Sequence, residues 1–216
     1  MPPVQHHIPE DIVQAYVSGR LPHAFAVVVA AHLSLCDACR ATAEAQEALA
    51  GAALDALPSD AAPDADLRAR TLAALDSVEA LPREAMPIPA PAGIYPSAVM
   101  AELGGRPPRW KSLGAGIRQT ILTAGPEGSV RLLYIPGGKA VPDHGHNGLE
   151  MTMVLQGAFQ DITGKYARGD VQVGDPDLEH TPIAMEGEAC ICLAATDAPL
   201  RFNALVPRLL QRVFRI

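Results

Sequence analysis

Apolar and polar positions follow two different patterns along this chain. Residues 9–81 place apolar side chains such as Leu67, Leu72, Leu75 and Val78 near helical spacing, which indicates amphipathic helices. In the second half, short runs of β-compatible residues alternate with turns that contain glycine, which predicts many short strands. The sequence therefore predicts an α + β protein of two domains, a small helical bundle followed by an all-β sandwich or barrel.

Proline and glycine set the expected boundaries. We expect helices over 9–19, 22–33, 39–54 and 66–81, and a loop over 58–63. We expect strands over 119–122, 130–135, 150–155, 158–162, 170–173, 189–194 and 199–202. Five prolines between residues 82 and 96 exclude helix and ladder pairing and favour an extended tether. We place the helical domain at 1–85, a proline-rich linker at 86–96 and the β-domain at 97–216.

Charge is unevenly distributed. Residues 1–94 hold 5 Lys or Arg and 12 Asp or Glu, a net charge of −7, whereas residues 95–216 hold 12 of each. Direct binding of nucleic acid needs a basic face, and the 9 aromatic residues (1 Trp, 4 Tyr, 4 Phe) are too few for a base-stacking platform. We therefore expect no direct nucleic-acid binding. The acidic helices could bind a basic protein surface or only aid solubility.

The chain carries no sign of export or of a membrane span. Its first residues have neither a basic segment nor an apolar core, which predicts that there is no signal peptide. The most apolar run, Leu21 to Leu35, is too short to cross a bilayer. The four cysteines form two close pairs, which favours metal binding or thiol chemistry in a reducing compartment. We expect a cytoplasmic protein.

The first candidate metal site is the motif His32-x3-Cys36-x2-Cys39. Thiolate and imidazole ligands suit a closed structural zinc site. We expect the metal to clamp a turn between two helices. A tetrahedral site needs a fourth ligand; His7 is the expected donor, with His6 as the competitor.

The second candidate site contains only imidazole and carboxylate donors. The motif reads Gly138-x5-His144-x-His146-x3-Glu150-x6-Gly157, and His180 follows later. His144 and His146 are two residues apart, so on a strand they point to the same side. Three imidazoles and one carboxylate suit a divalent metal such as Zn, Mn, Fe or Ni in a site that keeps an open position.

This second motif resembles the first motif of the cupin family at every defining position. The resemblance implies a cupin β-barrel with metal ligands His144, His146, Glu150 and His180. The second cupin motif is only partly kept. Gly169 and His180 match it, but Asp175, Asp177 and Ala184 stand where the family has proline, glycine and asparagine.

A second pair of cysteines lies in the expected barrel. Cys190 and Cys192 alternate on a predicted strand and share one face. They are candidate redox thiols near the metal, or a pair of small buried side chains.

Residues 5–85, with the His-x3-Cys-x2-Cys motif, resemble the zinc-binding domain of bacterial anti-sigma factors. The resemblance implies a zinc bound by His7, His32, Cys36 and Cys39, and a one-to-one complex with a cognate extracytoplasmic-function-type sigma factor. The apolar run 25–31 would be bundle core, partner surface or both.

The whole chain is similar to soluble anti-sigma factors whose C-terminal cupin senses oxidative stress. The resemblance implies a regulatory protein that releases its sigma factor in response to singlet oxygen or organic hydroperoxides. The alternative is a cupin-type metal-dependent dioxygenase or related enzyme with an accessory helical domain, because the same ligands serve catalysts and sensors.

Overall fold

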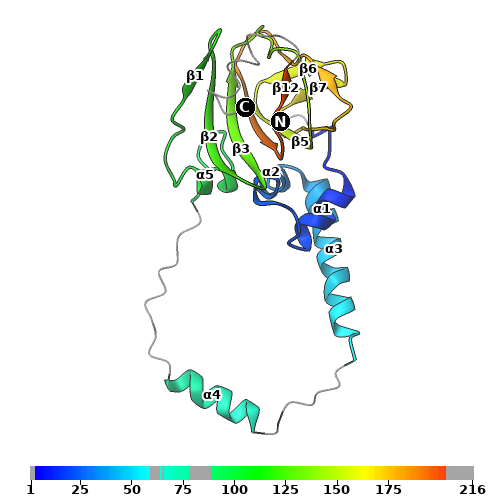
Figure 1. The fold of residues 1–216 in the computed structure, drawn as a ribbon. Helices are drawn as coiled ribbons and strands as arrows, with labels where there is room; N and C mark the ends of the chain where they lie inside the picture. Colours follow the sequence, from blue (N-terminus) through cyan, green and yellow to red (C-terminus); the bar gives the residue numbers. More distant parts are fainter. Residues whose placement is uncertain (1–2, 59–63, 65, 78–88, 203–216) are drawn as a thin grey trace.

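The computed structural model describes residues 3–58, 64, 66–77 and 89–202. Within these residues the helices are α1 Glu10–Val17, α2 His23–Leu33, α3 Asp37–Asp55, α4 Leu67–Ser77 and α5 Ser97–Glu102 (Figure 1). The four predicted helices are thus confirmed. Helix α5 was not predicted. The end of the fourth helix at 78–81, most of the loop at 58–63 and the linker residues 86–88 lie outside the described residues.

The strands begin after α5 and are all antiparallel. They are β1 Lys111–Gly114, β2 Ile117–Gly125, β3 Gly128–Ile135, β4 His144–Gly145, β5 Glu150–Gln156, β6 Ala158–Asp161, β7 Gly164–Ala167, β8 Val171–Gly174, β9 Glu179–His180, β10 Ile183–Ala184, β11 Cys190–Thr196 and β12 Arg201–Phe202. A six-stranded sheet has the order β1-β2-β3-β11-β5-β8, and two three-stranded sheets have the orders β10-β6-β7 and β12-β4-β9. The predicted α + β class is confirmed.

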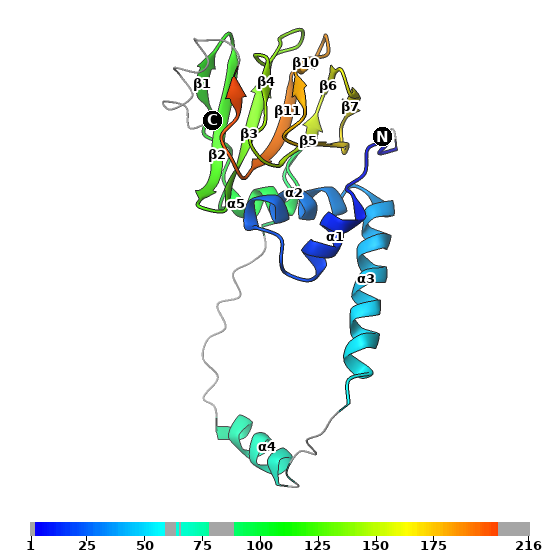
Figure 2. The same cartoon turned by 45° about the vertical axis from the view of Figure 1, so that its right-hand side comes forward.

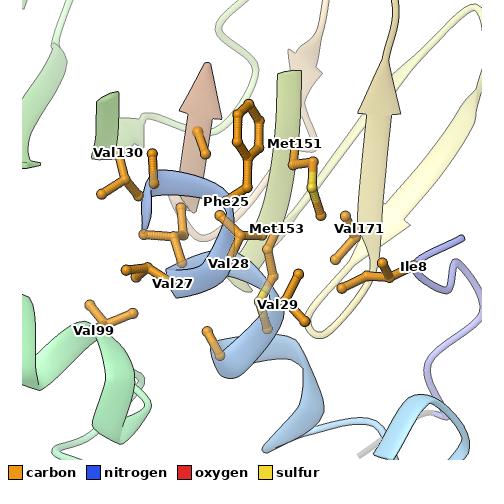
Figure 3. Close-up of a cluster of buried hydrophobic side chains, with 14 of the residues drawn as sticks. Ile8, Phe25, Val27, Val28, Val29, Val99, Val130, Met151, Met153 and Val171 are labelled. Atoms are coloured by element: carbon orange, nitrogen blue, oxygen red, sulfur yellow. The ribbon is translucent and has the colours of Figure 1, made fainter. Parts of the chain in front are cut away.

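Helix α2 is the element that joins the helical part to the barrel. Its sequence is apolar on all sides, and such a helix must be covered all round. It packs on β3, β5 and β11 on one side and on α1, α3 and α5 on the other. In Figure 3, Phe25 and Val28 point into the same cluster as Met151 and Met153 of β5.

Helices α1, α2, α3 and α5 and the six-stranded sheet therefore share one hydrophobic core. Burying a side chain such as Phe25 or Met151 contributes about 1.5–3 kcal/mol, and both are almost completely buried. Separating the chain at residue 85 would expose this face of α2. The apolar run 25–31 is thus core that is shared between the helical part and the barrel. The domain boundaries stay a prediction.

Helix α3 leaves this core. Figures 1 and 2 show α3 running away from the barrel and α4 standing apart from the other elements. No single helix among the described residues is long and apolar enough to cross a membrane; α2 and α3 pass that test only as a pair, bent by 116° at the break between them.

Candidate metal centres

The first centre gathers four side chains at the junction of the N-terminal segment, α2 and α3. His7 Nδ1 lies 3.2 Å from Cys36 Sγ and 3.6 Å from Cys39 Sγ. The donor atoms of His7, His32, Cys36 and Cys39 all lie within 4.8 Å of one another. We call these four residues the His/Cys centre.

The local sequence explains why two helices meet there. Helix α2 ends at Leu33, and the carbonyl of His32 accepts hydrogen bonds from the backbone N–H groups of Leu35 and Cys36. Cys36 then caps α3, because its Sγ accepts from the N–H of Cys39 at 3.4 Å. The predicted turn is present, and α3 begins two residues earlier than expected.

The structure separates the roles of the two neighbouring histidines. His6 faces the barrel, where its Nε2 lies 3.1 Å from the carbonyl oxygen of Lys165 and its ring lies against Tyr166 with centroids 4.3 Å apart. His7 points the other way, into the His/Cys centre. This geometry favours His7 over His6 as the fourth ligand.

The donors of the His/Cys centre fit zinc. His32 is fully buried, and its Nε2 has no hydrogen-bond partner, as expected of an atom that binds a metal. Burial lowers the pKa of His32, although the hydrogen bond to Gly169 opposes this shift. Burial also raises the pKa of Cys39. Two neutral imidazoles and two thiols that lose their protons on binding form a usual structural zinc set.

The second centre lies inside the barrel and consists of His144 on β4, His146 just after it and His180 on β9. The Nε2 atom of His180 lies 3.2 Å from that of His144 and 3.3 Å from that of His146. All three side chains are at least 96% buried. We call these three residues the three-histidine centre.

Hydrogen bonds on the far side of two rings fix their tautomers. His144 Nδ1 donates to the carbonyl oxygen of Pro142 at 2.8 Å, and His180 Nδ1 donates to Asp161 Oδ2 at 2.6 Å. In each ring Nε2 then keeps its lone pair and faces the centre. Burial lowers the pKa of His144, which favours the neutral ring. The residues therefore fit a divalent metal.

Glu150 lies beside the three-histidine centre rather than among its converging donors. Its Oε2 is 3.1 Å from Nδ1 of His146, and its Oε1 accepts from Thr152 at 2.8 Å. Burial would raise the pKa of Glu150, but the contacts with His146 and His144 outweigh it and lower the pKa to about 2. The carboxylate is thus ionised and adjacent, and its role as a metal ligand stays a prediction.

The departures in the second cupin motif do not displace His180. Asp175 replaces the usual proline, and its Oδ1 accepts from the backbone N–H groups of Asp177 and Leu178 at 3.0 and 3.1 Å. Such an aspartate turn orders the backbone before β9. Gly174, at the end of β8, leaves room for the site, because a Cβ there would lie 3.1 Å from Nε2 of His146.

Cys190 and Cys192 lie on β11, fully inside the barrel. Their Sγ atoms are 3.5 Å apart, and both residues are free thiols. The hydrogen bond to Cys190 and burial together raise the pKa of Cys192 well above its usual value. Both side chains contact the second hydrophobic cluster, around Val154 and Phe159.

Sequence reasoning missed the residues that hold the histidines in place. Asp161 sits in no motif, yet it accepts from His180, from Gln172 at 2.6 Å and from Thr163 at 2.6 Å. Gly169 was identified only as a motif glycine, yet its carbonyl oxygen lies 2.8 Å from Nδ1 of His32. No spacing along the chain signals either contact, since both join segments far apart in sequence.

Fold and site together define a cupin with a cluster of three histidines that could hold a metal, and its sheet is packed against a helical unit with its own His/Cys centre. The profile of the family described as ChrR Cupin-like domain matches residues 106–199. The chain is 48% identical to the anti-sigma-E factor ChrR of Cereibacter sphaeroides, over 99% of each chain. It also resembles the crystal structure of Rhodobacter sphaeroides SigE in complex with the anti-sigma ChrR, with 44% identity, a TM-score of 0.74 and coverage of 90% of this chain and 99% of that chain.

An identity of this size over the whole length shows the family: the chain belongs to the ChrR family of anti-sigma factors. The resemblance inferred from the two motifs is thereby confirmed.

Proposed function

We propose that this protein is a cytoplasmic anti-sigma factor that sequesters an extracytoplasmic-function-type sigma factor in a one-to-one complex and releases it under oxidative stress. The observation that carries the proposal is the similarity over the full length to an anti-sigma factor whose crystal structure contains its sigma factor. It is a regulatory role, and we assign the cupin no catalytic step.

The helices that leave the core support a partner-binding role. Leu49 and Leu54 on α3 are 71% and 69% exposed, and Leu72 and Leu75 on α4 are 51% and 63% exposed. Residues 67–76 of α4 are all exposed. Apolar surface of this extent usually marks an interaction site. We propose that the sigma factor covers these leucines.

Charge supports the same partner. The net charge of −7 belongs to residues 1–94, and Glu44, Glu47 and Asp55 lie on α3 beside the exposed leucines. A protein that binds polymerase and promoter DNA presents basic surfaces, which an acidic helix complements.

The His/Cys centre would hold zinc through His7, His32, Cys36 and Cys39. Zinc supplies a closed structural crosslink there. The chain's own residues then fix the angle between α2 and α3, since Cys36 caps α3 and His32 lies in the last turn of α2. We propose that this angle presents α3 to the sigma factor.

The cupin is the proposed sensor of singlet oxygen or organic hydroperoxides. His144, His146, His180 and the adjacent Glu150 would hold a divalent metal, which supplies an open coordination position. Asp161 and Pro142 keep two of these rings in the tautomer that presents Nε2. Cys190 and Cys192 are buried in the same barrel with their Sγ atoms 3.5 Å apart, so they are candidate thiols for oxidation only once the barrel opens.

Co-expression of the full chain with each extracytoplasmic-function-type sigma factor of its host tests the binding role. We expect a one-to-one complex on size-exclusion chromatography that carries zinc. Failure of every sigma factor to co-elute with a folded, metal-loaded chain would contradict the proposal and make a substrate screen for a cupin enzyme the next step.

A further inference from the structure

The turn between β7 and β8 holds the segment that carries His7. Asp170 Oδ1 accepts hydrogen bonds from the backbone N–H groups of Gln5 and His6 at 2.7 and 3.0 Å. The N–H of Val171 in turn donates to the carbonyl of His6 at 3.1 Å. Three hydrogen bonds therefore fix the backbone just before His7, and all three come from the barrel.

The same turn also orients His32. The carbonyl oxygen of Gly169 can only accept, so His32 Nδ1 carries the hydrogen in their 2.8 Å contact. Nε2 then has a lone pair and is the atom that lies within the His/Cys centre. Two of the four donors of that centre are thus positioned by residues of the cupin.

The other end of the strand reaches the three-histidine centre. Gln172 donates to Asp161 Oδ2 at 2.6 Å, and the same oxygen accepts from His180 Nδ1. Gly174, two residues further, lies directly against His146, since a Cβ there would be 3.1 Å from Nε2. One short strand and the turn before it contact both centres.

We propose that β8 couples the two metal centres. Gly169 and Asp170 are positioning residues for His32 and His7, and Gln172 is a positioning residue for His180, acting through Asp161. A strand is a stiff element of about 3.3 Å per residue. A shift at the three-histidine centre therefore moves the acceptors that hold the His/Cys centre. The inference deepens the proposed function, since it gives a path by which a change in the cupin reaches the sigma-binding helices.

Coupling of this kind can be measured, because the metal affinity of one centre then depends on whether the other centre is intact. Cobalt bound to thiolate gives a near-ultraviolet charge-transfer band, and of the two candidate centres among the described residues, the His/Cys centre is the one that contains thiols. Titration of the metal-free full chain with Co²⁺, followed by displacement with Zn²⁺, therefore reports the zinc affinity of that centre. His144→Ala removes one donor of the three-histidine centre. His144 lies on β4, which pairs with β9 and β12.

We expect His144→Ala to change the zinc affinity of the His/Cys centre by about five- to 150-fold. Adding Gln172→Leu should reduce that effect below about twofold, because the link from β8 to Asp161 is removed. Thr120→Val is the matched control: Thr120 is buried on β2 and its hydroxyl has no hydrogen-bond partner, so the effect of His144→Ala should persist in that background.

Asp170→Asn gives a second readout. The side-chain amide oxygen can still accept from the backbone N–H groups of Gln5 and His6, but the amide NH2 group then faces the N–H of Ala167, which is also a donor. We therefore expect weaker zinc binding by the His/Cys centre, whereas the cupin still binds its metal. The inference is overturned if His144→Ala leaves the zinc affinity unchanged, or if its effect survives Gln172→Leu. If the complex with the sigma factor still forms when the coupling is overturned, the proposed function is unaffected.

Discussion

His180 donates its Nδ1 hydrogen to Asp161 across 2.6 Å in the interior of the barrel, where both side chains are almost completely buried. Asp161 remains an acceptor because Thr163 and Gln172 also donate to it, and these hydrogen bonds lower its pKa although burial opposes them. The contact decides which nitrogen of His180 faces the other two histidines.

Asp161→Asn should therefore weaken metal binding by the cupin by about 10- to 100-fold. The amide turns a donor toward His180 and favours the tautomer whose Nε2 carries the hydrogen. Calorimetric titration of the metal-free protein measures the change. Unaltered affinity would show that this contact does not set the tautomer.

Replacing both Cys36 and Cys39 with serine should remove zinc from the His/Cys centre and abolish sigma-factor binding. In the proposed function the small helical unit depends on zinc for its arrangement. Metal analysis and size-exclusion chromatography of the co-expressed proteins measure both effects. The double variant Cys190→Ser/Cys192→Ser is the control that keeps this zinc. Retained binding by the Cys36/Cys39 variant would contradict a structural role of zinc.

Leu49→Asp and Leu54→Asp should each weaken sigma-factor binding by about 1–2 kcal/mol or more, because a charge replaces an apolar contact at the proposed interface. Both side chains are exposed in the free protein, so thermal unfolding should change little. Ile162→Asp is the matched control, since Ile162 is 85% exposed on the barrel. An equal loss of affinity in all three variants would place the interface elsewhere.

Cys192 should be unreactive toward iodoacetamide in the folded protein near neutral pH. Its raised pKa keeps the thiol protonated, and the thiolate is the reactive form. Mass spectrometry after brief alkylation, with and without denaturant, measures the protection. Rapid labelling of Cys192 in the native chain would show that the barrel opens and would favour direct sensing of the oxidant by this thiol.

Zinc affinity of the His/Cys centre should rise with pH across the neutral range. Burial raises the pKa of Cys39, so this thiol is protonated at neutral pH and zinc must displace its proton. For each displaced proton, the affinity for zinc falls about tenfold with every pH unit below that pKa. Burial lowers the pKa of His32, so this ring is already neutral and adds little. Competition with a chelator of known affinity at several pH values measures the slope; a flat profile would contradict it.

The sequence predicts the regular elements well where a pattern repeats. Helices α1 and α2 begin directly after Pro9 and Pro22, α3 is rich in alanine, α4 has leucines near helical spacing, and β3, β5 and β11 are long enough to show a β-run. The two-residue strands β4, β9 and β10 are too short to show any pattern. Strands β4 and β9 form because His144 and Gly145 pair with His180 and Glu179, and β10 forms because Ile183 and Ala184 pair with β6.

Two pairs among the candidate metal donors could be brought together from the sequence alone because their spacing is local. His144 and His146 are two residues apart, and Cys36 and Cys39 are three apart, so local geometry alone brings each pair together. Asp161, Gly169 and Asp170 could not be predicted, because their contacts depend on how the barrel packs on the N-terminal segment. The shared core beneath α2 was missed for the same reason, since an all-apolar helix does not reveal which surfaces cover it.

Transcription by the host RNA polymerase with the cognate sigma factor, measured as the full chain is added, tests the central claim most directly. We predict that transcript from a sigma-dependent promoter falls to the background level near one equivalent of zinc-loaded protein and returns when excess sigma factor is supplied. Transcript that is unchanged at several equivalents of a folded, zinc-loaded chain would contradict the anti-sigma function.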